Sequence, residues 1–520
     1  MTRRLRALAV LLLGVCGSLA RADGLYHEQY RPQFHFTPPQ QWMNDPNSMV
    51  YDHGEYHLFY QYHPYSNKWG PMHWGHAVSK NMVDWDNLPI ALFPDRYGTI
   101  FSGSVVMDSA NTSGFGAQAK SPLVAMFTYQ DHLSENLGHT GFQSQGLAYS
   151  LDRGRNWVKY QGNPVLTSPA VRDFRDPKIF WHAPSRHWIV AIAVADHVAF
   201  YSSADLKHWA HESDFGKEWG AHGGVWECPD LIAMTLGGTA INKYVLMVSV
   251  GKGGPNGGSA TQYFVGDFDG HKFNLDPDQP ERLNSSPLWL DYGTDNYAGS
   301  TWSGGPSHDK RVNFIGWMSN WDYAASVPTQ RWRSAMTLPR ELKLVQTVRG
   351  LELHSVPVAE LVALRNAKLS LAAQTISQPL DLTKIAGTKG GLLEINLDLD
   401  TPGADDVELR FGNSRGERVV FRLNKSERRY ELDRTASGAV DFDKAFPSLQ
   451  TAPLRDSGDH VTLKILLDQS SIEVFVNDGE TVITSLAFPT VPYDQVTLKA
   501  DHPINLNSGS LYELRSIWKN

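Results

Sequence analysis

Long apolar runs, cysteines and an excess of basic charge are all scarce in this sequence. No interior stretch approaches the roughly 18 apolar residues of a membrane-spanning helix, so no membrane partner is expected for the mature chain. There are only 2 cysteines in 520 residues. Acidic residues outnumber basic ones, 55 to 47, and no basic stripe is present, which argues against nucleic acid as a partner.

Residues 1–22 have the pattern of a secretory signal peptide: an arginine-rich start, an apolar run over residues 7–15, and an A-x-A cleavage site ending at Ala22. A lipoprotein signal that uses Cys16 is the alternative, but Val15 is large for the residue before a lipidated cysteine. Cleavage after Ala22 leaves 43 basic against 55 acidic residues, a net charge of −12 instead of −8. Only Cys228 then remains, so we expect a secreted or periplasmic protein without an internal disulfide.

Helical periodicity is almost absent from the first two-thirds of the chain. Short apolar runs rich in β-formers predict strands at residues 56–62, 123–127, 188–193 and 244–250. One unit recurs: a strand that ends in a small polar residue, an acidic turn, and then an aromatic residue. The aromatics that close this unit are Trp85, Trp157, Trp209 and, more loosely, Phe273.

These aromatics stand 72, 52 and 64 residues apart. A repeat of about this length, with several strands in each unit, is typical of propeller blades. We therefore predict an all-β chain with a five-bladed β-propeller catalytic domain over residues 27–345. A non-repeating β-sandwich is the alternative, but it does not predict a fixed repeating unit. Residues 346–369 are expected to be a linker, with residues 358–365 as its best helical candidate. Over residues 370–520 the apolar residues alternate, and residues 477–480 supply a hairpin turn, which predicts a C-terminal β-sandwich.

Three carboxylates lie in similar local contexts, far apart in the sequence. Asp45 lies in W-M-N-D-P-N, Asp176 in F-R-D-P and Glu227 in W-E-C-P-D. A propeller gathers the inner strand of every blade around one channel, so we expect these three side chains to meet in one pocket. The proline after each aspartate should hold it in extended geometry, Asp45 at the end of a strand. On its own, N-D-P-N is also ordinary turn chemistry.

Two carboxylates that flank the scissile bond are what most glycosidases need. Glu227 lies between a tryptophan and a cysteine, an apolar setting that should raise its pKa and suits a general acid/base. Asp45 lies among amide donors, so it should keep a low pKa and act as nucleophile. Asp176 is left to bind ring hydroxyls, with Arg175 beside it to hold it ionised. Direct attack by Asp45 predicts a separation of about 5–5.5 Å between its carboxyl group and that of Glu227.

Other catalytic classes have less support, and no metal or cofactor is predicted. His73 and His76 are three apart in a predicted strand and point to opposite faces, so they are poorly placed to share a metal ion. The glycine-rich run 251–258 fails the G-x-G-x-x-G pattern and precedes a strand, so we expect a loop between strands. There is no G-x-S-x-G nucleophile motif. Cys228 has no histidine nearby in sequence, and shaping the pocket around Glu227 is its better role.

The three acidic motifs, in this order and spacing, resemble glycoside hydrolase family 32, which contains invertases, inulinases and levanases. The resemblance extends to residues 100–104, 295–298, 316–321 and 470–475, and so spans nearly the whole mature chain. It implies a propeller plus a β-sandwich and retaining hydrolysis of β-fructofuranosides through a covalent fructosyl-enzyme. It gives Asp45, Glu227 and Asp176 the roles of nucleophile, acid/base and transition-state stabiliser. One departure is Ser48, where many members carry glycine.

The same resemblance implies a fructose pocket, whose matching positions in this sequence are Asn44, Gln61, Trp69, Phe101, Ser102, Arg175 and Cys228. Trp317 and Trp321 are further candidates for sugar contact, with propeller packing as the alternative for each. The motifs at 316–342 are closer to bacterial levanases and exo-inulinases than to invertases, so a fructan, levan or inulin, is the expected substrate, and sucrose a lesser one. Two rivals remain: an arabinan- or xylan-cleaving propeller glycosidase, and a non-catalytic carbohydrate-binding propeller.

Overall fold

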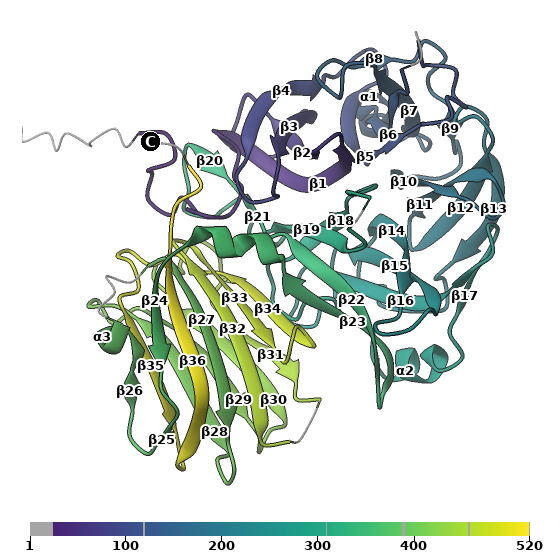
Figure 1. Ribbon diagram of the computed structural model, residues 1–520. Helices are drawn as coiled ribbons and strands as arrows, with labels where there is room; N and C mark the ends of the chain where they lie inside the picture. The colour runs from purple at the N-terminus through teal and green to yellow at the C-terminus, as the bar shows by residue number, and fades with distance from the viewer. Residues whose placement is uncertain (1–23, 118–119, 308, 387–390, 456–457, 519–520) are drawn as a thin grey trace, which may run out of the picture.

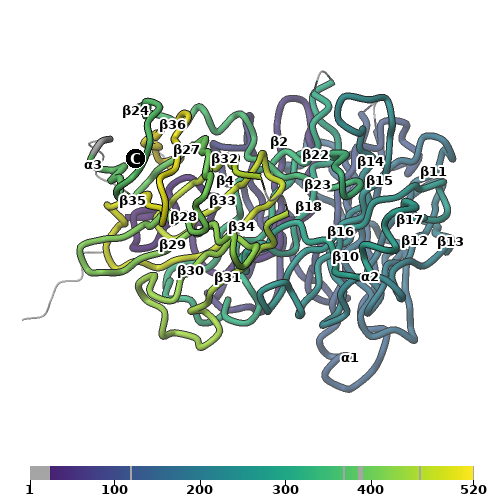
Figure 2. The backbone as a smooth tube through the Cα atoms, turned by 90° about the horizontal axis from the view of Figure 1, so that it is seen from below, coloured from purple at the N-terminus to yellow at the C-terminus, as the bar shows by residue number. Residues whose placement is uncertain are grey.

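The computed structural model describes residues 24–117, 120–307, 309–386, 391–455 and 458–518. The predicted signal peptide, residues 1–22, therefore lies outside the described residues. Strands dominate the described chain, as the sequence predicts, and they form two groups of sheets that lie side by side (Figure 1, Figure 2). Within the described ranges no helix is both long enough and apolar enough to span a bilayer.

The N-terminal part of the described chain contains five sheets, each built mainly from strands that follow one another in sequence. The first consists of β1 (Gln41–Asp52), β2 (Glu55–His63), β3 (His73–Ser79), β4 (Asp86–Leu92) and β20 (Trp332–Arg333). The second consists of β5 (Thr99–Met107), β6 (Leu123–Gln130), β7 (Gln143–Ser150), β8 (Val158–Lys159) and β9 (Leu166–Thr167). Helix α1 (His132–Asn136) follows β6.

The remaining three sheets repeat this order. The third consists of β10 (Phe174–His182), β11 (His187–Val194), β12 (His197–Ser203) and β13 (Ala210–Phe215). The fourth consists of β14 (Trp226–Thr235), β15 (Asn242–Val250), β16 (Ala260–Phe268) and β17 (Phe273–Leu275), followed by helix α2 (Gln279–Ser285). The fifth consists of β18 (Tyr297–Thr301), β19 (Val312–Met318), β21 (Ala335–Met336), β22 (Arg340–Thr347) and β23 (Gly350–Pro357).

The first strands of these five sheets surround one centre (Figure 1). β1 contacts β5, β5 contacts β10, β10 contacts β14, β14 contacts β18, and β18 contacts β1, so the ring is closed. Hydrogen bonds close it as well, because β20 pairs in parallel with β1 through Trp332 and Gln41. The first sheet is therefore completed by residues from the far end of this part of the chain.

The repeating unit seen in the sequence has the same place in the first three sheets. β3, β7 and β12 are third strands, and each ends in a serine, Ser79, Ser150 or Ser203, whose hydroxyl hydrogen-bonds to an Asn or Asp two residues later. The closing aromatic then stands next to the fourth strand. The prediction of a strand–turn–aromatic unit is confirmed, and the glycine-rich run 251–258 lies in the predicted loop, between β15 and β16.

Each first strand carries a β-bulge near its start. The pairing register shifts between residues 43 and 46, 100 and 103, 175 and 178, 227 and 230, and 297 and 300. A bulge interrupts the ladder and re-aims the side chains within it. Asp45, Ser102, Asp176 and Cys228 lie inside these bulges, so the irregular backbone of all five strands gathers at one end of the ring.

The bulges correct two expectations about the backbone. Asp45 lies inside β1 and not at a strand end. Asp176 has φ 61° and Cys228 has φ 48°, so neither is extended. The bulge outweighs the preference for extended geometry that the following proline imposes. Ser48 has φ 55°, in the left-handed region that favours glycine, so the serine at this position adopts a backbone conformation that glycine reaches at lower cost.

The C-terminal part is a sandwich of two antiparallel sheets that share one hydrophobic cluster. One sheet consists of β24 (Arg365–Leu371), β25 (Gln374–Ile376), β27 (Leu393–Asp400), β32 (His460–Asp468), β33 (Ser471–Val476), β34 (Thr481–Leu486) and β36 (Ile504–Leu514). The other consists of β26 (Leu380–Asp381), β28 (Asp406–Gly412), β29 (Arg418–Asn424), β30 (Arg429–Ala436), β31 (Leu449–Pro453) and β35 (Gln495–Ala500); helix α3 (Leu382–Ala386) follows β26. The turn predicted at residues 477–480 joins β33 to β34.

The linker predicted over residues 346–369 is mostly regular structure. β23 pairs along its whole length with β22, and β24 already belongs to the sandwich. Between them lies one short 3₁₀ helix, η1 (Ala359–Leu364), where the sequence favours a helix. β23 shows only two inward leucines, Leu351 and Leu353, which is too short an alternation to be recognised in the sequence.

A buried polar network joins the two parts of the molecule. Arg340 donates hydrogen bonds to Asp291 at 2.9 Å and to Glu473 at 2.8 Å. His35, in the segment before β1, lies 2.7 Å from Asp468 and 3.0 Å from Glu473. All five side chains are buried. Because a buried charge that loses its partner is strongly destabilising, this network fixes the start of the chain and β22 against β32 and β33.

Candidate active site

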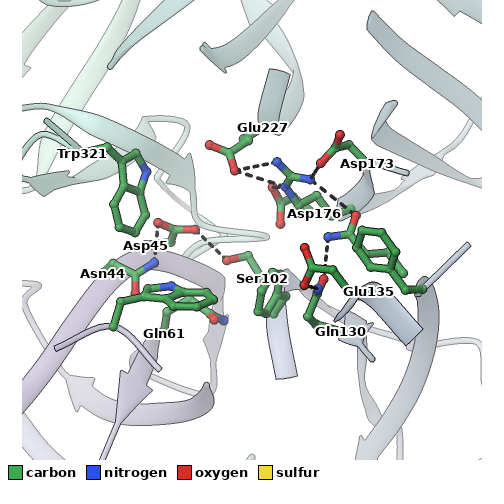
Figure 3. A pocket seen from close by; sticks show the side chains of 15 residues that line it. Asn44, Asp45, Gln61, Ser102, Gln130, Glu135, Asp173, Asp176, Glu227 and Trp321 are labelled. Atoms are coloured by element: carbon green, nitrogen blue, oxygen red, sulfur yellow. Dashed lines mark hydrogen bonds and ion pairs between the residues drawn. The ribbon is translucent and has the colours of Figure 1, made fainter. Parts of the chain in front are cut away.

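A cavity of about 270 Å³ opens at the end of the ring where the bulges gather (Figure 3). Its walls come from strands and loops of all five N-terminal sheets. The lining residues are Asn44, Asp45, Gln61, Trp69, Phe101, Ser102, Gln130, Glu135, Phe142, Gln143, Asp173, Arg175, Asp176, Glu227 and Trp321. The three carboxylates that are far apart in the sequence therefore meet in one cavity, as predicted.

Asp45 lies on the wall formed by β1. Its Oδ1 accepts a hydrogen bond from Asn44 Nδ2 at 2.9 Å, and its Oδ2 accepts one from the Ser102 hydroxyl at 2.9 Å. Burial raises the pKa of Asp45 to about 6, and the charge of Glu227 adds to this rise, whereas the hydrogen bonds from Asn44 and Ser102 oppose it. The low pKa expected for Asp45 is therefore wrong, because two donors do not compensate for desolvation and a neighbouring charge.

Asp176 lies on the bulge of β10, opposite Asp45. Its Oδ2 accepts a hydrogen bond from the Cys228 N–H at 3.1 Å. The Cys228 thiol lies between the two aspartates, with Sγ 3.6 Å from Asp176 Oδ2 and 3.8 Å from Asp45 Oδ2. Burial raises the pKa of Asp176, and the nearby Arg175 only partly offsets this. The expectation that Arg175 holds Asp176 ionised is therefore wrong.

Arg175 donates hydrogen bonds to Glu227 and not to Asp176. Its Nε and Nη2 both donate to Glu227 Oε1, at 3.1 and 3.0 Å, and its Nη1 donates to Asp173. The Tyr297 hydroxyl donates to the other oxygen, Glu227 Oε2. The setting of Glu227 is thus polar, in contrast to the apolar setting inferred from its sequence neighbours. These donors fix the direction in which the Glu227 carboxyl group faces the cavity (Figure 3).

Most of the predicted sugar-contact residues lie in the cavity wall, and two do not. Gln61 is buried there and its Nε2 has no partner among the described residues, so this donor is free for a ligand. Trp321 lines the cavity, but Trp317 is fully buried and packs against Trp42 and Trp321. Trp317 is therefore a packing residue and the prediction of sugar contact for it is wrong. Cys228 lies behind the wall and contacts the carboxylates.

Sequence reasoning missed one side of the cavity. Five lining residues were not predicted: Gln130, Glu135, Phe142, Gln143 and Asp173. They come from the end of β6, from α1, from β7 and the loop before it, and from the loop before β10. Three of them form a chain of side-chain hydrogen bonds. Gln143 Nε2 donates to Gln130 Oε1 at 2.7 Å, and Gln130 Nε2 donates to Glu135 Oε2 at 2.6 Å. Only Asp173, two residues before Arg175, lies close enough to a recognised motif to be found from the sequence.

Family models cover almost the whole described chain. The model of the glycosyl hydrolases family 32 N-terminal domain matches residues 35–357, and that of the family 32 C-terminal domain matches residues 360–513. The chain belongs to glycosyl hydrolase family 32. As a member of this family it is a glycoside hydrolase, and the two matched regions meet where β23 ends and η1 begins.

Family 32 relatives match along nearly all of the chain. The levanase of Bacillus subtilis (strain 168) is 46% identical over 514 residues, which cover 98% of this chain and 74% of the levanase. An extracellular exo-inulinase of Aspergillus niger is 40% identical over 515 residues, covering 94% of each.

Solved family 32 structures have the same fold. The crystal structure of the exo-inulinase from Aspergillus awamori superposes with a TM-score of 0.85 at 35% identity, covering 95% of this chain and all of that one. The β-fructofuranosidase from Schwanniomyces occidentalis, complexed with fructosyl-erythritol, superposes with a TM-score of 0.84 at 30% identity, covering 94% of this chain and 99% of that one.

Proposed function

We propose that this chain hydrolyses β-D-fructofuranosides, chiefly fructans such as levan or inulin, and sucrose to a lesser extent, with retention of configuration. The observation that carries the proposal is that Asp45 and Glu227 face one cavity that also holds Asp176. A pair of carboxylates on either side of a glycosidic bond is the machinery of most glycosidases. The levanase, exo-inulinase and β-fructofuranosidase relatives support fructose as the sugar.

The mechanism assigns one role to each carboxylate. Asp45, when ionised, attacks the anomeric carbon of the fructosyl unit and forms an ester with it, while protonated Glu227 gives its proton to the leaving oxygen. Water then attacks the same carbon, Glu227 takes the proton of that water, and the ester bond to Asp45 breaks. Two displacements retain the configuration, and this requires a carboxyl separation of about 5–5.5 Å. Arg175 and Tyr297 orient Glu227 for both steps.

Asp176 binds ring hydroxyls of the fructosyl unit. Its raised pKa means that it holds a proton more readily than an exposed aspartate does, so it serves as donor or acceptor to a hydroxyl. Asn44, Gln61 and Ser102 supply further polar contacts, and Trp69, Phe101 and Trp321 supply ring faces and edges around the sugar.

The finer features of the fold belong to the same proposal. The five N-terminal sheets are the blades of a five-bladed β-propeller, which supplies the cavity, and the sandwich from about residue 365 supports it. The boundary lies at η1. Residues 1–22 direct export to the periplasm or the medium, as the name of the extracellular A. niger relative supports.

The test is the release of fructose by purified protein. Wild-type protein should release fructose from levan or inulin, and no pentose from arabinan or xylan. Glu227→Ala should lower turnover by about 10²–10⁴-fold because it removes the acid/base. Glu218→Ala, which changes an exposed glutamate outside the cavity wall, is the matched control and should leave turnover unchanged. Pentose release, or equal turnover by wild type and Glu227→Ala, would contradict the proposal.

A further inference from the structure

Exposed aromatic side chains are not spread evenly over this molecule. Among the described residues only four aromatic side chains are largely exposed: Tyr65, Trp69, Phe93 and Trp181. Three of these four belong to the first sheet, with exposed fractions of 72% for Tyr65, 44% for Trp69 and 52% for Phe93. Trp69 is also part of the cavity wall. A cluster of exposed aromatic side chains next to a binding cavity indicates a ligand-binding surface.

All three residues lie at the cavity end of the first sheet. Tyr65 and Trp69 belong to the loop that joins the end of β2 to the start of β3, and Phe93 directly follows the end of β4. Asp45 near the start of β1 marks the same end, because β2 and β4 run antiparallel to β1 and β3. The strand order in this sheet is β1, β2, β3 and β4, so the row leads outward from the cavity to the outermost strand.

Ring contacts connect Tyr65 and Phe93 through a histidine, whereas the Trp69 ring contacts Phe101 and His132. The Tyr65 ring centroid lies 6.0 Å from that of His63 and 5.7 Å from that of His73, and the His73 centroid lies 5.5 Å from that of Phe93. All are edge-to-face contacts, and Tyr65 and Phe93 remain exposed. The two histidines are buried and support the exposed rings from below.

Hydrogen bonds hold the row in place before any ligand arrives. His63 Nδ1 donates to the Lys68 carbonyl at 2.8 Å, and Asn67 Nδ2 donates to the Gln330 carbonyl at 2.6 Å, so the loop that carries Tyr65 and Trp69 is anchored at two points. Gly70 lies so close to the His63 ring that a Cβ atom there would stand 2.5 Å from it. A rigid row of rings loses little conformational entropy when it binds a chain.

We propose that Tyr65 and Phe93, continuing from Trp69, form a binding track for the fructosyl units of a polymer that lie outside the cavity. This inference rests on the proposed function, because the occupant is the remainder of the same chain whose end enters the cavity. Rings interspersed with histidine and lysine suit the mixed apolar and hydroxylated faces of a sugar chain. Even if fully exposed, three aromatic side chains present at most about 750 Å², which is less than a stable protein interface buries.

The test compares a polymer with a short substrate. Tyr65→Ala and Phe93→Ala should each lower kcat/KM on inulin or levan about two- to tenfold, mainly through a higher KM, because each removes one stacking contact. Sucrose fills only the cavity, so its kcat and KM should stay unchanged in both variants. Trp181→Ala is the matched control: this exposed tryptophan lies at the opposite end of β10 from Asp176, and its loss should affect neither substrate.

The outcomes separate this inference from the proposed function. Three outcomes would overturn the proposed track. The first is unchanged polymer kinetics in both variants, and the second is an equal loss of kcat/KM on polymer and on sucrose. The third is hydrolysis of sucrose by the wild-type protein without hydrolysis of either polymer. Wild-type protein that releases no fructose from any of the three substrates would instead overturn the proposed function.

Discussion

Ser102 controls the ionisation of Asp45 more directly than any other uncharged side chain in the cavity except Asn44. Its hydroxyl donates to Asp45 Oδ2 at 2.9 Å, and this hydrogen bond opposes the rise of the Asp45 pKa to about 6. A hydrogen bond to a charged group contributes about 1.5–3 kcal/mol, and water in the open cavity replaces part of it. A net loss of about 1.4 kcal/mol corresponds to one pKa unit. Ser102→Ala should therefore raise the Asp45 pKa by about one unit.

The expected result is a displaced acid limb in the pH profile of kcat/KM, which reports the ionisation of the free enzyme. In the proposed mechanism Asp45 attacks only when ionised, so activity should be present above the Asp45 pKa and be lost as the pH falls through that value. At pH 5 the kcat/KM of Ser102→Ala should be about tenfold lower than that of wild type. At pH 8 the shift in the Asp45 pKa should cause almost no difference in kcat/KM. Initial rates on sucrose between about pH 4 and 9 measure this. A loss of sugar contact would lower the whole curve equally and would not move the limb.

Ser104→Ala is the matched control for this experiment. Ser104 lies on the same strand, but its hydroxyl donates to the Pro177 carbonyl at 2.8 Å and not to Asp45. The acid limb of Ser104→Ala should stay near the wild-type position, with its midpoint at about pH 6. If the limb of Ser102→Ala coincides with that of wild type, the assignment of Asp45 as the group that must lose a proton is wrong.

Two further substitutions test the support of the site and the fold. Tyr297→Phe removes a donor to Glu227, so kcat on sucrose should fall about tenfold. On fructosyl fluoride kcat should fall less, because the fluoride leaving group needs no proton. Equal falls in kcat on the two substrates would contradict this role of Tyr297. Arg340→Met leaves Asp291 buried without a cation and Glu473 with only His35 beside it, so urea denaturation should show about 3–5 kcal/mol less free energy of unfolding. The exposed Arg410→Met should cost under about 0.5 kcal/mol, and similar losses in both variants would refute the network.

The strands and the meeting of Asp45, Asp176 and Glu227 could be predicted because they follow from local patterns. Apolar runs give the strands, a serine and an aromatic mark the same turn in successive sheets, and a ring of sheets brings the starts of its inner strands together. Motifs that lie far apart in the sequence then become neighbours without any knowledge of side-chain contacts. Ser102 and Gln61 were expected in the cavity only because their positions match the fructose pocket of glycoside hydrolase family 32.

The electrostatics could not be predicted because they depend on which distant groups meet. Nothing near Glu227 in the sequence shows that Arg175 and Tyr297 will hold both of its oxygens. For the same reason the pKa of Asp45 was expected to be low, although burial and the charge of Glu227 raise it. The left-handed backbone at Asp176 was missed because a bulge depends on the register with the neighbouring strand.

The segment around His35 and the start of β1 make contacts with residues that are synthesised much later. β1 gains its second strand partner, β20, only at Trp332, and His35 pairs with groups 433 and 438 residues further along. Contacts between such distant residues slow folding, since the intervening chain must be ordered first. A nascent chain that has not yet reached residue 332 therefore lacks a closed ring seam, and one that has not yet reached residue 468 lacks a fixed amino-terminal segment. If the chain is exported as proposed, export during synthesis would handle the polypeptide before these contacts form.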